Sequence, residues 1–243
     1  MSRRKKIGII IISILAGLIL IACASFIIYV NDYYEAIDIA EYLESSDSVD
    51  VKEDDYNYYF IPKSYESGII MYPGAKVEEE AYAPICRMLA EEGYLVILLH
   101  MPFNLAFFDS DRAEDIIDDY QDIDFYLMGH SLGGAMASSY LASNSDKYEG
   151  IILLASYSTK SLRNKDLDVL SIYGSNDKVL NKSNYNKNKK NLPDDYTEYI
   201  IDGGNHGYFG SYGKQDGDGT ATITKLTQWS ITVTVIDTFI SRN

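Results

Sequence analysis

The chain has 243 residues, of which 47% are hydrophobic and 23% charged, and its formal net charge is −15 at pH 7. This size and apolar content fit one globular domain with a short appendage and exclude an intrinsically disordered protein. The acidic excess argues against nucleic acid as a partner.

The first predicted element is an N-terminal membrane anchor at residues 1–30. Basic residues at positions 3–6 precede an uncharged apolar run at 7–30. A helix of that length, at about 1.5 Å per residue, crosses a hydrocarbon core of about 30 Å. Because Lys and Arg mark the cytoplasmic side, the sequence predicts a single-pass protein whose remaining chain, from Asp32 and Glu35 on, lies outside the cytoplasmic membrane.

Two alternatives to an uncleaved anchor stay open. The run Leu20-Ile21-Ala22-Cys23 resembles the signal-peptidase box of bacterial lipoproteins, which would place lipid on Cys23, and a simple secretory signal has the same basic and apolar parts. The apolar character continues through Val30, which favours the anchor. The only other cysteine is Cys86, so neither a disulfide within the domain nor a cysteine-based metal site is expected.

A stalk and a folded domain are expected after the anchor. Residues 31–50 are acidic and mildly amphipathic, which predicts a juxtamembrane helix or stalk, and residues 51–243 form the domain. Residues 49–62 alternate and are rich in Tyr, as in one or two edge strands.

The domain alternates short apolar runs with helical patterns. Strands are expected at 68–72, 94–100, 123–128, 150–155, 168–173 and 196–201, and helices at 78–92, 112–120, 132–143, 181–191 and 222–241. The run 231–236 is β-branched and favours a strand by propensity, but its terminal position favours a helix. Such β/α alternation predicts a mostly parallel sheet with helices on both faces.

The pattern Gly129-His130-Ser131-Leu132-Gly133 lies directly between an expected strand and an expected helix. It matches the G-x-S-x-G nucleophile elbow, in which the sharp turn exposes the serine and the two glycines avoid clashes between strand and helix. The sequence therefore predicts Ser131 as a nucleophile, with Gly129 and Gly133 shaping its turn.

A serine hydroxyl needs a base, and the chain has three histidines. His206 follows the last expected strand in a glycine-rich loop, at the same sheet edge as Ser131, and is the predicted base. The side chain of His130 points away from that of Ser131 in such an elbow. His100 is expected to line the pocket or to be structural.

A carboxylate must orient the imidazole and stabilise its charged form. Asp177 ends the turn Gly174-Ser175-Asn176-Asp177 after the strand at 168–173 and is the predicted acid. Asp202 is the rival, although its position before two glycines favours a turn residue.

Acyl transfer also needs N–H donors for the oxyanion. The backbone of Leu132, the residue after the nucleophile, is one expected donor. The second should come from the loop that follows the strand at 68–72, from either Ala75 or Lys76, and the sequence does not decide between them.

Four motifs together carry a family resemblance: Tyr-Pro-Gly-Ala-Lys-Val at 72–77, Gly-His-Ser-Leu-Gly-Gly at 129–134, Gly-Ser-Asn-Asp at 174–177 and Gly-Gly-Asn-His-Gly-Tyr-Phe-Gly at 203–210. They resemble the bacterial α/β-hydrolases related to dienelactone hydrolase, especially a membrane-anchored branch. The resemblance runs from about Ser64 to the C-terminus and implies an α/β-hydrolase fold, a Ser131–Asp177–His206 triad and ester hydrolysis. Dienelactone hydrolases have cysteine where Ser131 stands, so their substrate does not carry over.

The expected activity is that of a serine hydrolase that cleaves a carboxylic ester, small or linked to the cell envelope, without cofactor or metal. The acidic turn at 216–219 lacks the further ligands of a calcium loop and is expected to be solvated. The short segment 157–167 leaves little room for a lid, and the apolar Phe103, Leu105, Phe107 and Phe108 line the pocket or belong to the core. An acyltransferase acting on an envelope acceptor, a peptidase and a catalytically silent binding domain remain as alternatives.

Overall fold

A computed structural model describes residues 2–120 and 122–242, and the chain divides into two compact units, Met1–Tyr33 and Tyr34–Asn243. The first unit contains a single helix, α1 (Arg3–Asn31), whose N-terminus is capped by the side chain of Ser2. Its most apolar stretch has a mean hydropathy of 3.0, so the helix is long and apolar enough to cross a membrane. A signal sequence at the N-terminus would meet the same criterion.

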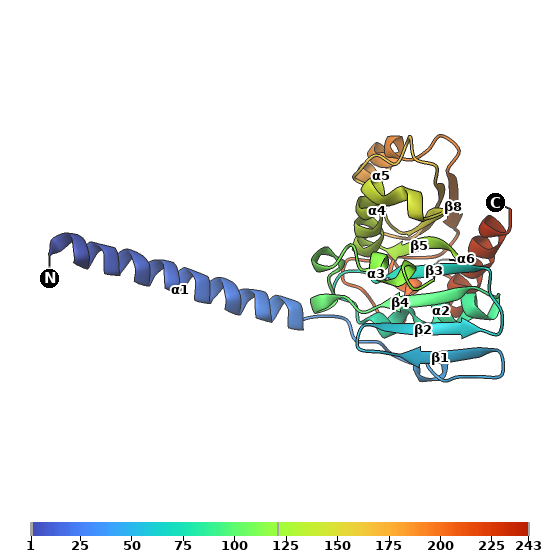
Figure 1. Ribbon diagram of the computed structural model, residues 1–243, viewed down its shortest axis with the longest axis horizontal. Helices are drawn as coiled ribbons and strands as arrows, with labels where there is room; N and C mark the ends of the chain where they lie inside the picture. The colour runs from blue at the N-terminus through green and yellow to red at the C-terminus, as the bar shows by residue number, and fades with distance from the viewer. Residues whose placement is uncertain (1, 121, 243) are drawn as a thin grey trace. The chain divides into compact units, whose positions relative to one another are not determined.

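The second unit is built on one sheet of eight strands in the order β1-β2-β4-β3-β5-β6-β7-β8 (Figure 1). The strands are β1 (Val49–Glu53), β2 (Asn57–Pro62), β3 (Ser67–Tyr72), β4 (Leu95–Leu99), β5 (Asp124–His130), β6 (Gly150–Leu154), β7 (Asp168–Gly174) and β8 (Thr197–Ile201). The pairs β1–β2 and β2–β4 are antiparallel, and all other neighbouring strands are parallel. The predicted mostly parallel sheet is therefore confirmed, and residues 49–62 supply its antiparallel edge.

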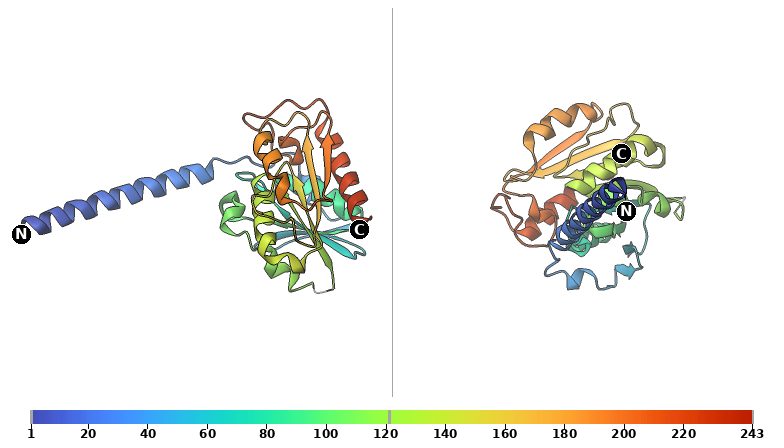
Figure 2. Two further views of the ribbon diagram at one scale, coloured as in Figure 1. Left: turned by 90° about the horizontal axis from the view of Figure 1, so that it is seen from above. Right: turned by 90° about the vertical axis from the view of Figure 1, so that its left-hand side faces the viewer.

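Helices cover both faces of this sheet (Figure 2). On one face lie α2 (Ala83–Glu91) and α6 (Lys225–Ile240), and on the other lie α3 (Ala113–Ile117), α4 (Leu132–Asn144) and α5 (Lys182–Asn188). Successive strand residues alternate between the two cores: Ile69 and Met71 of β3 pack under α2 and α6, whereas Ile70 and Tyr72 pack on the side of α4. Since both faces are buried, each central strand is an uninterrupted apolar run.

Three expected helices differ in extent from the sequence prediction. The segment 78–92 begins with a 3₁₀ turn (Glu79–Tyr82), and its α-helix starts only at Ala83, with Pro84 in the first turn. The segment 112–120 contains only the five residues of α3, and 181–191 continues beyond α5 as a 3₁₀ turn (Lys189–Asn191).

The β-branched C-terminal run is helical, as its position indicated. The buried side chains of α6 include Trp229, Thr232, Val233, Ile236 and Ile240, which recur at helical spacing. Burial of this stripe against the sheet outweighs the intrinsic strand preference of Thr, Val and Ile.

Residues 34–50 pack onto the domain instead of forming an α-helix. Tyr34 makes a parallel bridge with Val77, and the N–H of Ile37 donates to the carbonyl of Ser211 at 2.7 Å. The only helical turn in this segment is a 3₁₀ turn (Ala40–Tyr42). The folded unit thus begins at Tyr34, about 17 residues earlier than the boundary expected from the sequence.

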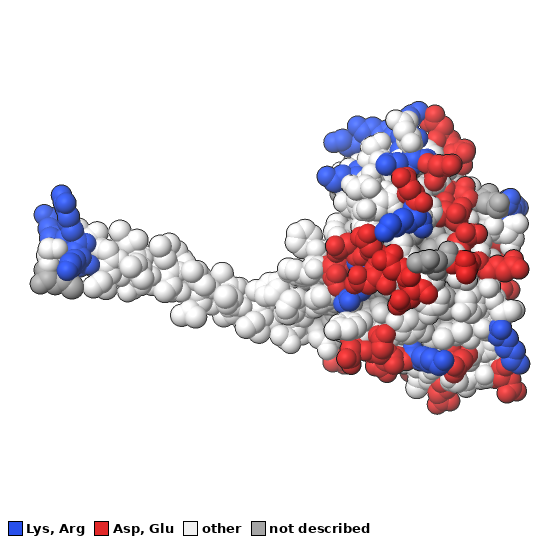
Figure 3. All heavy atoms as spheres, in the orientation of Figure 1, with Lys and Arg blue, Asp and Glu red and all other residues white. Residues whose placement is uncertain are grey.

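Charged side chains are unevenly distributed over the face of the domain in Figure 3. Acidic groups gather over α3, where Asp111, Asp115, Asp118 and Asp119 are exposed. Basic groups gather around α5 and the turn that follows it, where Lys187 and Lys190 are exposed. On the face shown, acidic side chains are therefore concentrated around α3.

The loops that carry the predicted site residues all follow parallel strands. Residues 73–76 follow β3, Ser131 follows β5, Asp177 lies after β7, and His206 after β8. Because the carboxyl ends of parallel strands meet at one edge, the sheet brings these four loops to the same rim.

Candidate active site

Ser131 occupies a strained turn between β5 and α4. Its backbone has φ 52° and ψ −118°, a left-handed conformation that residues with a side chain rarely adopt. Two hydrogen bonds hold the turn: the Ser131 N–H donates to the carbonyl of Leu154 at 2.9 Å, and the Ser156 hydroxyl donates to the Ser131 carbonyl at 2.6 Å. The serine is thus displayed by a turn with the predicted elbow geometry.

The glycines of the elbow are required by close backbone contacts. A Cβ atom on Gly129 would overlap the backbone of Gly134, and one on Gly133 would overlap the carbonyl oxygens of Tyr72 and Pro73. These neighbours are main-chain atoms of β3, of Pro73 directly after it and of α4, so no side-chain movement relieves the clash.

We therefore expect Gly133→Ala to destabilise the domain by about 3 kcal/mol, through overpacking against a fixed backbone. Denaturant unfolding of the detergent-solubilised chain measures this loss. Gly207→Ala is the matched control, because its added methyl group meets nothing closer than 3.6 Å. Equal stability of the two variants would contradict the steric role of Gly133.

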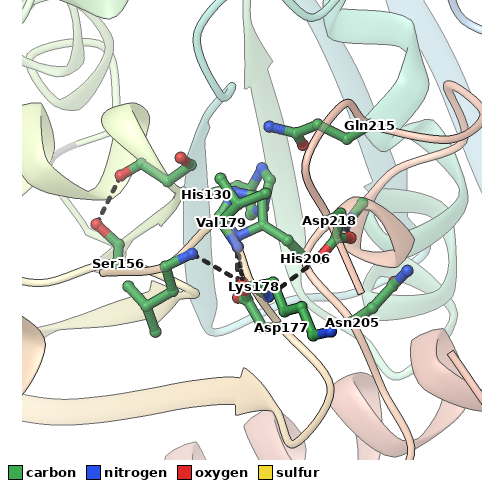
Figure 4. A network of polar contacts seen from close by, with 12 residues as sticks. His130, Ser156, Asp177, Lys178, Val179, Asn205, His206, Gln215 and Asp218 are labelled. Atoms are coloured by element: carbon green, nitrogen blue, oxygen red, sulfur yellow. Dashed lines mark hydrogen bonds and ion pairs between the residues drawn. The ribbon is translucent and has the colours of Figure 1, made fainter. Parts of the chain in front are cut away.

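Asp177 and His206 form a buried pair. His206 Nδ1 lies 2.9 Å from Asp177 Oδ2, and both side chains are almost completely inaccessible to solvent (Figure 4). The other carboxylate oxygen, Oδ1, accepts the N–H groups of Val179 at 2.9 Å and Leu180 at 2.8 Å. Because these amides fix the carboxylate, the imidazole is held in one orientation.

Ser131 and His206 line the same cavity of about 360 Å³. The wall of this cavity is mainly apolar and includes Leu132, Met136 and Leu180. His206 Nε2 is buried and makes no hydrogen bond within residues 2–120 and 122–242. The hydrogen bond between the serine hydroxyl and the imidazole is therefore not formed in this conformation, and no other group in the described part of the chain bonds to His206 Nε2.

A buried glutamine of α6, which the sequence did not single out, supports the His206 loop. Gln228 Oε1 accepts the N–H of Asn205 at 3.0 Å, and Gln228 Nε2 donates to the Asn205 carbonyl at 2.9 Å. The Asn205 side chain in turn donates to the carbonyl of Gly219 at 2.9 Å. Nothing in the sequence distinguishes Gln228 from other polar residues of a helix, so its role is visible only from the tertiary contact.

Asp218 joins the loops of the acid and the base. Its Oδ2 accepts the N–H of Gly207 at 2.9 Å, and its Oδ1 accepts the N–H groups of Gly219 at 2.7 Å and Lys178 at 3.3 Å (Figure 4). One carboxylate thus bridges the residues that follow His206 and Asp177. The acidic turn expected to be solvated therefore has a structural partner, which only the fold reveals.

The candidate oxyanion donors lie at the start of α4 and in the loop after β3. Leu132 is the first residue of α4, where N–H groups have no partner within the helix. The N–H of Lys76 donates to the carbonyl of Asn104 at 2.8 Å, whereas no such bond is found for the N–H of Ala75 among the described residues.

His130 lies beneath the elbow and is buried. Its Nδ1 is 2.8 Å from the hydroxyl of Tyr82, and its ring centroid is 4.5 Å from that of His206. Burial lowers the pKa of His130 well below its ordinary value, and the neighbouring His206 lowers it further.

The remaining candidates lie outside the pair and the cavity. His100 is half exposed and contacts Glu79 Oε1 at 2.6 Å, and Asp202 is exposed and accepts the hydroxyl of Ser175 at 3.3 Å. Leu105 is buried in the fold. Phe103, Phe107 and Phe108 are exposed and do not line the cavity of Ser131.

The sequence matches the model of the alpha/beta hydrolase family over residues 68–230, and the chain therefore belongs to this family. The match concerns the family as a whole and does not single out the dienelactone hydrolases. No curated protein matches the sequence significantly.

Several solved structures share the fold. A predicted CIB-like hydrolase of Thermoplasma acidophilum is 17% identical, with 79% of this chain and 100% of that chain covered, at a TM-score of 0.58. The monoacylglycerol lipase of Paleococcus ferrophilus is 14% identical, with coverage of 77% and 100% and a TM-score of 0.60. MGS-MChE2, an alpha/beta hydrolase enzyme from a lagoon-sediment metagenome, is 17% identical, with coverage of 65% and 90% and a TM-score of 0.54. At these identities the likeness shows the fold alone.

Proposed function

We propose that the protein is a serine hydrolase that cleaves carboxylic esters through an acyl-enzyme, with Ser131 as nucleophile, His206 as general base and Asp177 as the orienting acid. One observation carries the proposal. His206 is bound to the buried Asp177 carboxylate at 2.9 Å, and it lines the same cavity as Ser131 of the elbow. Membership in the alpha/beta hydrolase family supports the same chemistry.

Acylation begins with a rotation about the Cα–Cβ bond of Ser131 that directs its hydroxyl toward His206 Nε2. Apo enzymes often have such contacts open, and they close in the complex with substrate. The Ser131 oxygen then attacks the ester carbonyl while its proton passes to Nε2, and the imidazolium is stabilised by the Asp177 carboxylate. The same proton goes to the leaving alcohol as the tetrahedral intermediate collapses.

Two backbone N–H groups are proposed to stabilise the oxyanion. The Leu132 amide lies at the positive end of the α4 dipole, which favours developing negative charge. Of the two candidates in the other loop, Ala75 is the better donor, because the Lys76 N–H already donates to Asn104. In deacylation, His206 takes a proton from water as the water oxygen attacks the acyl-enzyme, and it returns this proton to the Ser131 oxygen as the acid is released.

The apolar wall of the cavity indicates a substrate with an apolar acyl or alcohol group. A volume of about 360 Å³ lies near the lower end of typical ligand pockets, so one modest group fits there. The ester activity of the structurally similar monoacylglycerol lipase points to the same bond type. The substrate is either a small ester or one linked to the cell envelope.

Hydrolysis of p-nitrophenyl acetate, butyrate and octanoate by the detergent-solubilised chain tests the proposal. We expect saturable release of p-nitrophenol, and transfer products on addition of alcohols or amines would instead indicate an acyltransferase. A folded chain that hydrolyses none of the three esters and transfers no acyl group would contradict the proposed function.

Asp218 is expected to act through His206 and Asp177 without touching the substrate. We predict that Asp218→Ala lowers kcat about 10-fold with little change in KM, because a small displacement of the base costs rate. Asp218→Asn, which retains one acceptor oxygen, should lose less. Asp216→Ala removes a neighbouring exposed carboxylate and serves as the control; an equal effect of the two alanine variants would refute the bridging role.

We further propose that α1 is an uncleaved anchor that holds the domain outside the cytoplasmic membrane. Its length and apolar surface support this topology, as do the basic residues that precede it. We expect the protein recovered from the membrane fraction to have the mass of the full-length chain. We also expect protease added to intact spheroplasts to cleave the domain. A mature N-terminus at Cys23, lost in Cys23→Ala, would establish the lipoprotein instead, and a soluble secreted domain would establish a cleaved signal.

A further inference from the structure

A buried chain of hydrogen bonds joins the loop after β3 to the nucleophile elbow. The N–H of Gly74 donates to the hydroxyl of Tyr82 at 3.0 Å, and this hydroxyl lies 2.8 Å from Nδ1 of His130. Tyr82 and His130 are 0% and 1% exposed. Three segments that are distant in the sequence thus meet directly below Ser131, which follows His130 in the chain.

The directions of these bonds follow from their donors. The Gly74 N–H can only donate, so the tyrosine hydroxyl accepts from it and keeps its single proton free to donate to His130 Nδ1. In this arrangement the imidazole of His130 is neutral and carries its hydrogen on Nε2. The lowered pKa of His130 is consistent with this neutral form.

The packing around this chain is tight. A Cβ atom on Gly74 would lie 2.7 Å from the Tyr82 oxygen and 2.8 Å from His130 Nδ1. A glycine is thus required where the loop crosses the pair. With the Gly74 N–H bound to Tyr82 and the Lys76 N–H bound to Asn104, both amides that flank Ala75 are fixed.

We propose that Tyr82 and His130 form a positioning pair that sets the Ala75 amide at the correct distance from Ser131 for oxyanion stabilisation. The inference rests on the proposed hydrolase function. It assigns Tyr82 and His130 a role in positioning the oxyanion donor and no role in proton transfer. The pair acts through Gly74 on one side and through the Ser131 backbone on the other.

Tyr82→Phe in the full-length chain tests this role, because it removes the hydroxyl and keeps the ring. We expect kcat to fall on the order of 10- to 100-fold with KM within about 2-fold, since the loss of one oxyanion donor costs about 100- to 1000-fold and a displaced donor costs less. Tyr148→Phe is the matched control: Tyr148 is also buried and donates to the hydroxyl of Tyr140 at 3.2 Å, away from the cavity of Ser131.

A second pair of variants tests the histidine. His130→Gln retains an acceptor for the Tyr82 hydroxyl, whereas His130→Leu does not. We therefore expect kcat of His130→Gln to be at least about 5-fold higher than kcat of His130→Leu, which is a modest part of the loss caused by removing one oxyanion donor. If Tyr82→Phe fails to fold, this comparison decides the question, and equal kcat values for the two variants overturn the proposal.

The outcomes separate this inference from the proposed function. Inactive Ser131→Ala together with a selective fall of kcat in Tyr82→Phe supports both. A second outcome overturns the positioning pair alone. In it, Ser131→Ala is inactive, and Tyr82→Phe has the wild-type kcat, although its Tm falls as much as that of Tyr148→Phe. Full activity of Ser131→Ala overturns the proposed function, and the positioning pair with it.

Discussion

Ser131→Ala is expected to lower kcat for ester hydrolysis by about 10⁴- to 10⁶-fold and to leave the fold intact. The variant removes the proposed nucleophile, so that only a direct attack by water, assisted by the proposed oxyanion donors, would remain. The free-energy cost of the backbone conformation at φ 52° is about the same for Ala as for Ser, so the free energy of unfolding should change little. Steady-state kinetics with p-nitrophenyl butyrate, alongside circular dichroism, measures both properties.

Ser138→Ala is the matched control for this loss. Ser138 is fully buried in α4, and its hydroxyl donates to the carbonyl of Ala135 at 2.9 Å. Its removal should change kcat by less than about 3-fold, which corresponds to a fraction of a kcal/mol. Residual hydrolysis in Ser131→Ala close to the wild-type rate would mean that another group performs the chemistry.

Asp177→Asn is expected to lower kcat by about 10³- to 10⁴-fold. The amide oxygen of the asparagine would still accept the N–H groups of Val179 and Leu180, and its NH₂ group would then face His206 Nδ1. A donor at this position makes Nδ1 the acceptor and leaves the hydrogen on Nε2. Such an imidazole cannot accept the proton of Ser131.

Asp202→Asn provides the comparison for Asp177→Asn. Asp202 is exposed and its carboxylate is bound to Ser175, so we expect kcat within about 2-fold of wild type. Measurement of kcat and KM for both variants, with thermal unfolding to confirm folding, distinguishes the two acids. A larger loss in Asp202→Asn than in Asp177→Asn would show that the acid was assigned to the wrong strand end.

The central sheet and the rim at which the candidate site loops meet could be predicted because each depends on local patterns. Strands buried on both faces are continuous apolar runs, and the expected strand at 150–155 agrees with β6 (Gly150–Leu154) to within one residue. The elbow is a contiguous motif, and the glycine turns around Asp177 and His206 follow strands whose carboxyl ends share one rim.

The supporting residues could not be predicted, because their partners are distant in the sequence. Asp218 bonds to Lys178 across 40 positions, and Tyr82 bonds to His130 across 48. Gln228 contacts Asn205 across 23 positions, from a helix in which its polar side chain has no distinguishing pattern. Such contacts depend on tertiary packing, which neither periodicity nor propensity encodes.

Residues 34–50 illustrate the opposite error, in which a local pattern is overruled by the fold. Spaced apolar residues, among them Ile37 and Leu43, suggested a juxtamembrane helix or stalk, but the N–H of Ala36 donates to Glu78 Oε2 at 2.7 Å and the N–H of Ile37 to Ser211. Asp38 adopts φ 54°, which interrupts any regular helix. Backbone groups bound by the domain are not available for helical hydrogen bonds.

Mass spectrometry of the full-length chain after treatment with a fluorophosphonate is the most direct test of the Ser131–His206–Asp177 arrangement. We predict a single time-dependent phosphonyl adduct on Ser131, slowed by orders of magnitude in His206→Ala, because a serine hydroxyl reacts only when an adjacent base takes its proton. A folded wild-type chain that forms no adduct, or that carries it on another residue, would contradict the arrangement.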